Sequence, residues 1–356
     1  MTNFPEIVQE PQFSGSTSPD PAQSLIDSHG RVITDLRVSV TDRCNYKCVY
    51  CRTGQVGAQY DELTTEQYLR LIRNFVDLGI EKVRLTGGEP LLRRDLIEMV
   101  RELATWRIPA GPNAGQKLDI AITTNGHLLE DLAQPLKDAG LSRVTVSMDA
   151  VEQETFERVT RVPGSFPAVV RGIRAAQQAG LGPVKVNCVL LRGFNDDQIE
   201  GFGHLARREG IIVRFIEFMP LEEGRLWNLD MVVPVKEIVD RLSTVFPLKP
   251  LAPNAASETA RRYGFTDGLG EIGIIAPVTQ AFCGACSRIR LTSDGKIRTC
   301  LFSHREHDIY ALLRLGASDH ELRAFILQAV EKKEARHHIG EPGFLKPSRS
   351  MVHIGG

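Results

Sequence analysis

A glycine followed by an apolar residue recurs where amphipathic segments meet short β-rich runs, and this repeat constrains the fold more than any other feature. The junctions are Gly79-Ile80, Gly140-Leu141, Gly180-Leu181 and Gly210-Ile211. Because glycine tolerates the left-handed conformation that ends many helices, each junction indicates a helix followed by a strand. Strands separated by helix-length segments favour a parallel sheet with right-handed crossovers.

Six such strands are predicted, and they lie at residues 36–41, 82–86, 118–124, 143–148, 184–190 and 212–218. A closed barrel of this type has eight units, so the count fits a partial barrel or an open doubly wound sheet. We predict an α/β fold, a partial (β/α)6 TIM-like barrel of parallel strands with a small C-terminal α+β region.

Three parts of the chain are expected. Residues 1–30 are rich in Pro, Ser, Gln and Asp and are predicted to be a mobile leader. Residues 31–220 form the barrel. Residues 221–356 begin with a loop, a helix and a linker, continue with strands that include a hairpin at 288–301 turned by Ser293-Asp294-Gly295, and end in a polar tail.

The composition excludes several functions. A hydrophobic content of 42% and a charged content of 24% are typical of globular proteins, and a net charge of -1 argues against a general nucleic-acid or membrane-surface binder. No apolar stretch is long enough for a membrane span and no secretory signal is evident. We therefore expect a cytoplasmic protein without nucleic-acid or membrane partners.

The first group of cysteines follows the first predicted strand with the spacing Cys44-x3-Cys48-x2-Cys51. The carboxyl ends of parallel strands carry the chemistry of α/β folds. Three thiolates on one short loop can hold a four-iron cluster and leave one iron without a protein ligand. A structural zinc site is the alternative, although such sites have a closed fourth position.

The second group is Cys283-x2-Cys286-x13-Cys300, and it again supplies three thiolates. His304 follows closely and could complete a Cys3His zinc site, so the spacing alone leaves a zinc ion and an open cluster equally possible. The seventh cysteine, Cys188, lies outside both groups and is expected to be a small buried residue.

Two arginines lie beside the second group. Arg288 and Arg290 are two apart on a predicted strand and so share a face, as do Arg37, Ser39 and Thr41 on the first strand. An unpaired charge on the inward face of a barrel is costly, and a triphosphate would neutralise such guanidinium groups. A solvated strand face is the alternative.

The first cysteine loop and Gly87-Gly88-Glu89-Pro90 together resemble the radical S-adenosylmethionine (SAM) superfamily. The resemblance implies that the open iron chelates SAM, with Tyr50 beside the adenine. Further SAM contacts are expected from Gly88, Glu89, Ser147 and Met219. The two glycines would let the backbone approach a ligand closely, and Glu89 would offer an acceptor.

Longer strings resemble the GTP 3′,8-cyclase family, which starts molybdenum cofactor biosynthesis. They are Ser39-Val-Thr-Asp-Arg-Cys44, Leu85-Thr-Gly-Gly-Glu-Pro90, Thr123-Thr-Asn-Gly126, Cys283-Gly-Ala-Cys-Ser-Arg-Ile-Arg290 and Met351-x-x-Ile-Gly-Gly356. The resemblance implies two 4Fe-4S clusters, on Cys44, Cys48 and Cys51 and on Cys283, Cys286 and Cys300. It also implies GTP contacts from Arg37, Arg84, Thr123, Lys185, Arg288, Ile289 and Arg290, and catalytic roles for Arg288, Arg290, Gly355 and Gly356.

The implied reaction removes the ribose 3′ hydrogen of GTP and joins C3′ to C8. The implied partners are an electron donor such as flavodoxin or ferredoxin and a downstream cyclic pyranopterin monophosphate synthase, with the chain a monomer or homodimer. Two departures from the family, Arg52-Thr53 and an extra loop at 109–117, affect local loops. The competing hypotheses are another two-cluster radical SAM enzyme, such as a peptide-modifying one, and a non-enzymatic zinc-binding or redox-sensing module.

Overall fold

A computed structural model describes residues 24–51, 58–224 and 226–355. Within these residues one sheet runs in the order β12-β11-β10-β1-β2-β3-β4-β5-β6-β9-β8-β7. Its strands are β1 Asp35–Ser39, β2 Lys82–Thr86, β3 Asp119–Thr124, β4 Arg143–Ser147, β5 Lys185–Leu190, β6 Ile212–Glu217, β7 Leu248–Leu251, β8 Ala260–Phe265, β9 Glu271–Ile275, β10 Arg288–Leu291, β11 Lys296–Arg298 and β12 His307–Asp308.

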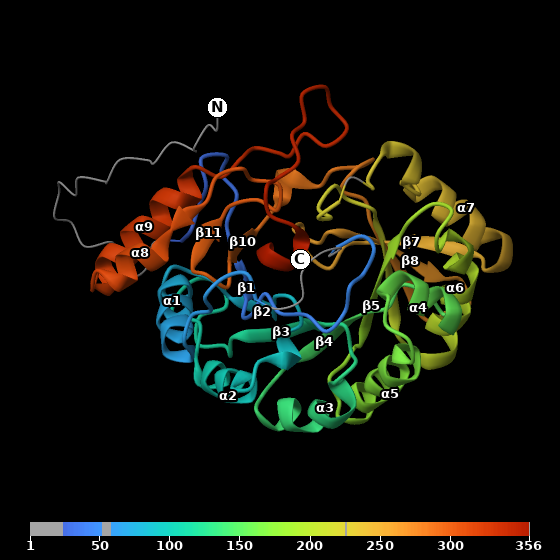
Figure 1. Ribbon diagram of the computed structural model, residues 1–356, viewed down its shortest axis with the longest axis horizontal. Helices are drawn as coiled ribbons and strands as arrows, with labels where there is room; N and C mark the ends of the chain where they lie inside the picture. The colour runs from blue at the N-terminus through green and yellow to red at the C-terminus, as the bar shows by residue number, and fades with distance from the viewer. Residues whose placement is uncertain (1–23, 52–57, 225, 356) are drawn as a thin grey trace.

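Strands β1 to β6 are parallel neighbours, and helices cover their outer side in an arc (Figure 1). The helices of the chain are α1 Thr65–Asp77, α2 Leu96–Thr105, α3 Leu129–Asp138, α4 Gln153–Thr160, α5 Ser165–Gln178, α6 Ile199–Glu209, α7 Val235–Val245, α8 Ile309–Arg314, α9 Asp319–Glu331 and α10 Met351–Ile354. The six predicted strands are confirmed with ends that differ by at most two residues, and the predicted partial barrel is confirmed as the fold class.

Helix α1 illustrates why the helices form where they do. Thr64 and Gln67 make a reciprocal capping box at its start, and its apolar stripe is fully buried against the sheet. Gly79 follows its end with a φ of 101°, a conformation that a residue with a side chain rarely adopts. The hydroxyl of Tyr68 donates to the carbonyls of Ser39 and Ser293, so this helix joins β1 to the C-terminal hairpin.

The C-terminal strands extend the barrel instead of forming a sheet of their own. Strand β10 pairs in parallel with β1, placing Arg290 opposite Arg37, and β9 pairs in parallel with β6 at the other edge. Strand β7, which pairs with β8, lies where the sequence predicted a linker. The C-terminal strands β10 and β9 therefore cover the edges that β1 and β6 would otherwise leave unpaired.

The described part of the chain begins earlier than the boundary predicted near residue 30. Leu25 and Ile33 are fully buried, and an isolated bridge pairs Ile26 with Val32. The Arg31 guanidinium forms an ion pair with Asp27. It also donates hydrogen bonds to the carbonyls of Cys283, Glu334 and Ala335. Residues 24–33 thus fasten the second cysteine group to the start of the barrel. Residues 1–23 lie outside the described residues, as do the departures at Arg52 and Thr53.

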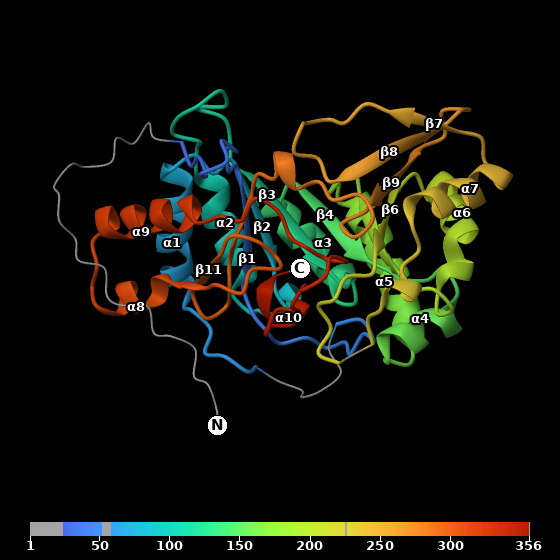
Figure 2. The same ribbon diagram turned by 90° about the horizontal axis from the view of Figure 1, so that it is seen from above.

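The C-terminal segment crosses the barrel opening and ends near its centre (Figure 2). Met351 donates its N–H to the carbonyl of Leu221 at 2.9 Å, and Ile354 is fully buried. The loop at 109–117, by contrast, forms a bridge between Arg107 and Lys117 just before the amino end of β3. It therefore lies at the end of the barrel away from the cysteine loop.

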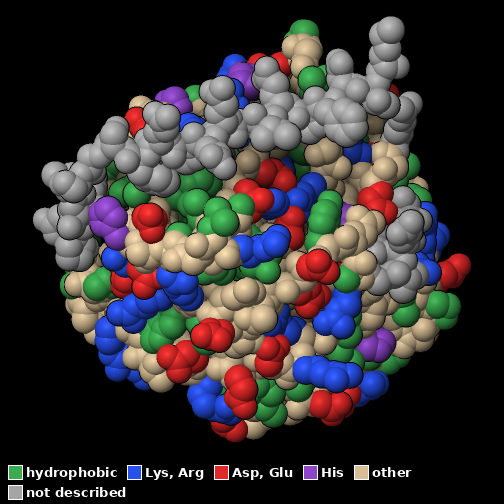
Figure 3. Space-filling view, turned by 60° about the vertical axis from the view of Figure 1, so that its left-hand side comes forward, with side chains coloured by type: hydrophobic (Ala, Val, Ile, Leu, Met, Phe, Trp, Pro, Cys, Tyr) green, Lys and Arg blue, Asp and Glu red, His purple; other side chains and the backbone are tan. Residues whose placement is uncertain are grey.

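Among the helices that the structure describes, none combines the length and apolar character that crossing a bilayer requires. Basic and acidic side chains are interspersed over the face drawn in Figure 3, in keeping with 43 Lys and Arg against 44 Asp and Glu in the whole chain. Any anion site must therefore be local.

Candidate active site

A cavity of about 290 Å³ opens at the carboxyl end of the parallel strands, and both cysteine groups line it. The cysteines are Cys44, Cys48, Cys51, Cys283, Cys286 and Cys300. The first three follow β1, whereas the last three come from the β10–β11 hairpin and the short turn before it. Because β10 pairs with β1, groups separated by more than two hundred residues of sequence face one chamber.

The first cysteine loop is held on both sides by backbone hydrogen bonds. Lys47 and Val49 donate to the carbonyls at the end of α4, Thr160 and Val159. Cys51 donates to Cys48, closing a turn that brings two sulfurs to the same side. The loop geometry is therefore fixed by the barrel before any ligand binds.

Gly87 and Gly88 allow two backbone segments of the protein to approach each other closely. A Cβ at Gly87 would lie 2.2 Å from the carbonyl oxygen of Thr41, and one at Gly88 would lie 2.2 Å from that of Arg43. The Gly88 N–H donates to Thr41 at 2.8 Å. These glycines let the loop after β2 touch the start of the cysteine loop, although both also line the cavity.

The Tyr50 hydroxyl donates to Asp149 at 2.7 Å, and the other oxygen of Asp149 accepts from the Val189 N–H. Burial raises the pKa of Asp149 to about 6. Tyr50 is thereby oriented at the cavity wall, where Ser147 and Met219 also lie. Four residues expected around SAM, these three and Gly88, line one cavity.

Glu89, expected as a SAM contact, is buried and fully engaged by donors from the protein. Its carboxylate accepts from the Leu91 N–H, the Thr124 hydroxyl and the Asn125 N–H, and its side chain does not line the cavity. Burial raises the pKa of Glu89 to about 7. The residue holds the loop after β3 in place, and Asn125 from that loop lines the cavity instead.

The second cysteine group lies in a basic environment. The Arg288 guanidinium donates to the Cys286 sulfur at 3.4 Å, and Lys333 donates to the carbonyls of Arg288 and Thr299. Burial alone would raise the pKa of Cys286, but Arg288 and Lys333 nearby lower it to about 6. A thiolate is the form of cysteine that binds a metal, so this environment suits a ligand.

A structural zinc ion was the alternative ligand for both cysteine groups. Among the residues the structure describes, no three His, Cys, Asp or Glu side chains converge closely enough to hold one ion. The His304 ring nitrogen contacts the Leu345 carbonyl at 3.0 Å, and the residue does not line the cavity. Thiolates on a four-iron cluster bind different irons and need no common point, so the trios fit clusters.

Five arginines line the cavity floor and the wall beneath the second cysteine group: Arg37, Arg84, Arg214, Arg288 and Arg290. Burial, together with Arg290 and Arg84, holds the pKa of Arg37 well below its usual range. Burial lowers the pKa of Arg84 to about 10 and that of Arg214 to about 9, each with help from a neighbouring arginine. The arginines repel one another, and a bound polyanion would relieve that repulsion.

Polar side chains orient two of these guanidinium groups. Arg84 donates to the hydroxyls of Thr123 and Thr145, and Arg214 donates to Asn187 and Thr145. Five further residues line the cavity that were not predicted from the sequence: Arg214, Asn187, Asn125, Phe282 and Lys333. The alternation that marked Arg37 on β1 would have found the first two, because Asn187 and Arg214 share a face with cavity residues Val189 and Ile216.

Four other residues expected at the site do not line the cavity or lie outside the described residues. The Ile289 side chain is fully buried in the main apolar core and does not line the cavity, so only its backbone could contact a ligand. Lys185 starts β5 and is half-buried below the cavity residues. Gly355 adopts a φ of 68° against β1, whereas Gly356 lies outside the described residues.

Solved structures share the fold at low sequence identity. Streptococcus suis SuiB bound to SAM aligns with a TM-score of 0.56 and 13% identity, covering 90% of this chain and 78% of that chain. The same protein bound to its precursor peptide SuiA gives a TM-score of 0.59 at 13% identity, covering 90% and 76%. At this identity the likeness establishes the fold alone.

The sequence matches the Radical SAM superfamily over residues 38–206 and Molybdenum Cofactor Synthesis C over residues 211–339. The barrel, the cysteine loop and the match to the Radical SAM superfamily together define a radical SAM enzyme. Enzymes of this class use SAM and an iron–sulfur cluster. The GTP 3′,8-cyclase of Moorella thermoacetica is 43% identical over 93% of this chain and 99% of its own, and that of Streptomyces coelicolor is 42% identical over 96% and 99%. The chain belongs to the GTP 3′,8-cyclase family.

Proposed function

We propose that this chain converts GTP into 3′,8-cyclo-7,8-dihydro-GTP, the first step of molybdenum cofactor biosynthesis. The observation that carries the proposal is one cavity lined by two cysteine trios and five arginines. Each trio provides a place for a cluster, and the arginines that line the same cavity suit a triphosphate. Relatives named GTP 3′,8-cyclase support GTP as the substrate.

The cofactors would be SAM and two 4Fe-4S clusters, one on Cys44, Cys48 and Cys51 and one on Cys283, Cys286 and Cys300. When bound, the first cluster and SAM supply a 5′-deoxyadenosyl radical, and the second offers an open iron beside the guanine. Tyr50, Gly88, Ser147 and Met219 would hold SAM. Glu89 would act through the Asn125 loop that its carboxylate fixes.

The residues of the chain act by binding, orienting and excluding water. Arg288 and Arg290 would bind the nucleotide from the second cysteine group. Arg37, Arg84 and Thr123, with Lys185 beneath, would bind its phosphates from the barrel, and Ile289 would contribute only its backbone. Gly355 and Gly356 would close the cavity. Holding C3′ near C8 while solvent is excluded is the geometric task, since no side chain need act as a nucleophile.

A peptide-modifying radical SAM enzyme remains the competing function, since SuiB shares the fold. Two observations favour the nucleotide. Burial and neighbouring arginines lower the pKa of the cavity residues Arg37 and Arg214, as at a polyanion site before it is filled, and the cyclase relatives cover nearly the whole chain at more than 40% identity.

The deciding experiment uses the anaerobically reconstituted protein with SAM, a strong reductant and GTP carrying deuterium at C3′. We expect deuterium in the 5′-deoxyadenosine and a product with the mass of unlabelled GTP but without guanine absorption, since one hydrogen atom is removed and one electron, from the reductant, and one proton are added. GTP labelled at C2′ is the control. Label transferred from C2′, or 5′-deoxyadenosine that does not increase with GTP, would refute the assignment.

The cluster count is tested separately. We expect about eight irons per chain after reconstitution, and about four in each of the variants Cys51→Ala and Cys286→Ala, because each trio would hold one four-iron cluster. Cys188→Ala is the matched control, since Cys188 is fully buried outside both groups and its variant should keep the full iron content. Equal iron in all variants would exclude two clusters.

The partners follow from the reaction. The electron would come from a donor such as flavodoxin or ferredoxin, and the product would pass to a cyclic pyranopterin monophosphate synthase. Two groups of thiolate ligands suit a reducing compartment such as the cytoplasm, and the enzyme would be a monomer or homodimer.

A further inference from the structure

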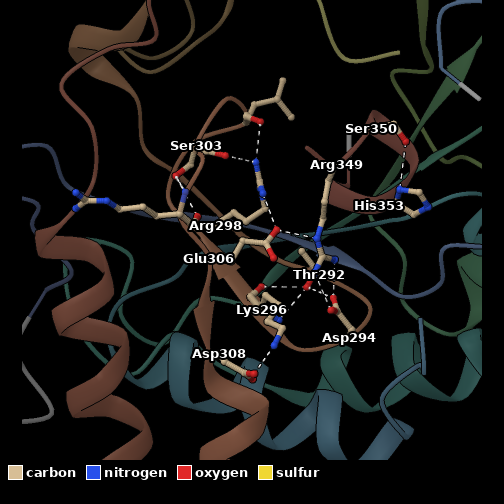
Figure 4. Close-up of polar contacts among 12 residues, drawn as sticks. Thr292, Asp294, Lys296, Arg298, Ser303, Glu306, Asp308, Arg349, Ser350 and His353 are labelled. Carbon is tan, nitrogen blue, oxygen red and sulfur yellow. Dashed lines mark hydrogen bonds and ion pairs between the residues drawn. The ribbon is translucent and has the colours of Figure 1, made fainter. Parts of the chain in front are cut away.

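The segment that ends the chain is held by one buried arginine. Arg349 is 9% exposed and forms a two-pronged ion pair with Asp294 at 2.9 and 2.8 Å, while its Nε contacts Glu306 at 2.8 Å (Figure 4). Its guanidinium also lies over the ring of Tyr60, 4.3 Å from the centroid. Few side chains other than arginine can make a planar double contact and an aromatic stack together.

The two carboxylates flank β11, the second strand of the C-terminal hairpin. Asp294 lies in the turn between β10 and β11, where Thr292 donates to it. Glu306 also accepts from Arg298, which is 1% exposed and donates to the carbonyl of Ser303. Figure 4 shows these side chains meeting between the hairpin and the terminal segment. The same hairpin carries Arg290 and leads to Cys300.

Tyr60 connects Arg349 to the other side of the cavity. Its N–H donates to the Asp42 carboxylate at 3.1 Å, and Asp42 directly precedes the first cysteine loop. The Tyr60 ring also meets the edge of His353, whose own ring contacts the Ser350 hydroxyl. Arg349 therefore lies between the segments that lead into the two cysteine groups.

The residues after Arg349 form part of the cavity wall. Met351 and Val352 line it, and Ile354 packs in a small cluster with Leu221 and Phe302. Gly355 lies so close to β1 that a Cβ there would be 2.8 Å from the Ser39 hydroxyl. Helix α10 has only four residues, too few to be stable by itself, so its position depends on what anchors it.

We propose that Arg349 is a positioning residue that locks residues 350–355 against the cavity through Asp294, Glu306 and Tyr60. The proposal rests on the proposed function only for its effect on turnover. With the lock closed, the wall formed by Met351 and Val352 excludes solvent from the reacting carbons. With the lock open, the terminal segment leaves the wall, and water and other hydrogen donors reach the chamber.

The test compares Arg349→Met, Arg349→Lys and Asp294→Asn in the reconstituted full-length protein. Lys296→Met is the matched control, because Lys296 forms an ion pair with Asp308 on the same hairpin without touching the terminal segment. The first readout is hydrogen exchange of the amides of residues 350–355, which needs no substrate. The second is the ratio of 5′-deoxyadenosine to cyclised nucleotide, with KM and kcat for GTP.

We expect Arg349→Met to speed hydrogen exchange of these amides about tenfold or more. It should also raise the ratio of 5′-deoxyadenosine to cyclised product and lower kcat by a larger factor than it changes KM. Arg349→Lys should restore part of the protection, because it keeps the charge but not the double contact. Asp294→Asn should give a smaller effect of the same sign, and Lys296→Met should match the wild type.

Unchanged exchange in both Arg349→Met and Asp294→Asn would overturn the proposal, as would faster exchange with an unchanged ratio. If Arg349→Met fails to fold, Arg349→Lys and Asp294→Asn decide. A wild-type protein that does not turn over GTP would instead refute the proposed function, while the exchange comparison would still be informative about the lock.

Discussion

The arginines of the cavity show how single residues can be arranged for a ligand at the cost of stability. Arg37, Arg84 and Arg214 are withdrawn from water beside other cations, and the pKa of each is lowered. Burying a charge without a counter-ion is destabilising. Arg298 is the contrast, because it is almost fully buried but forms an ion pair with Glu306 at 2.6 Å.

The variant Arg37→Met should therefore raise the free energy of unfolding of the nucleotide-free protein by about 1–3 kcal/mol, since it removes one of several mutually repelling charges. It should also abolish the stabilisation that GTP gives to the wild type. Thermal unfolding with and without GTP measures both effects. Arg298→Met is the control and should destabilise, by about 3 kcal/mol, because a paired cation is lost. Equal destabilisation by the two variants would contradict the prediction.

Lys185 gives the site a dependence on pH. Burial, followed by Arg214 and Arg143, lowers its pKa to about 8. Above this pH the amine loses its proton in the free enzyme, so its attraction for a triphosphate declines as pH rises. We expect kcat/KM for GTP to fall between about pH 7.5 and 9, and Lys185→Met to lack that part of the decline. Parallel pH profiles for the two proteins would show that Lys185 does not contribute.

At the scale of elements, the loops that carry ligands are shaped by contacts between backbones. The loop after β2 touches the start of the cysteine loop at Gly87 and Gly88, and α4 supports the cysteine loop from the other side. Because the contact leaves no room for a Cβ, the position of Cys44 depends on a glycine more than forty residues away in the sequence.

The variant Gly88→Ala tests this dependence without backbone strain, since Gly88 has no positive φ. We expect it to push the loops apart, to lower stability by about 1–3 kcal/mol and to reduce iron at the first trio, because overpacked contacts are relieved only by movement. Iron content and thermal unfolding are the measurements. Gly284→Ala is a matched control between two cysteines, with nothing within 4 Å of its Cβ. Full iron content in Gly88→Ala would show that the contact is not needed.

At the scale of the whole molecule, the described strands form one continuous sheet. Its C-terminal strands cover the two edges of the six-stranded parallel part. Strand β10 pairs with β1, and β9 with β6, so the C-terminal part completes the barrel at both sides. This arrangement brings the second cysteine group and the terminal segment to the opening, where Figure 2 shows α10.

A chain truncated after residue 220 should therefore aggregate, although it keeps all six predicted barrel strands. It would expose unpaired edges at β1 and β6 together with the apolar surface that β9 and β10 cover. Sedimentation of the purified fragment measures the outcome, and co-expression with residues 221–356 should restore part of the soluble material. A monomeric, folded fragment would show that the barrel does not need its C-terminal strands.

Much of the site was determined by the sequence because its signals are local. The glycine junctions placed the six parallel strands, since a helix end and the strand after it are set by neighbouring residues. The spacing of each cysteine trio identified its members, and alternation along β10 put Arg288 and Arg290 on one face, where both line the cavity. These features need no knowledge of what lies across the molecule.

Only the tertiary structure decided which distant segments meet. It placed both trios on one cavity, bonded the Glu89 carboxylate to the loop after β3, and turned Ile289 into the core. It also showed that a side chain at Gly88 would clash with the backbone of Arg43. The partners of Arg349, which are Asp294, Glu306 and Tyr60, likewise became visible only in the structure. Such contacts depend on strand pairing and chain packing over long sequence separations, and no local pattern encodes them.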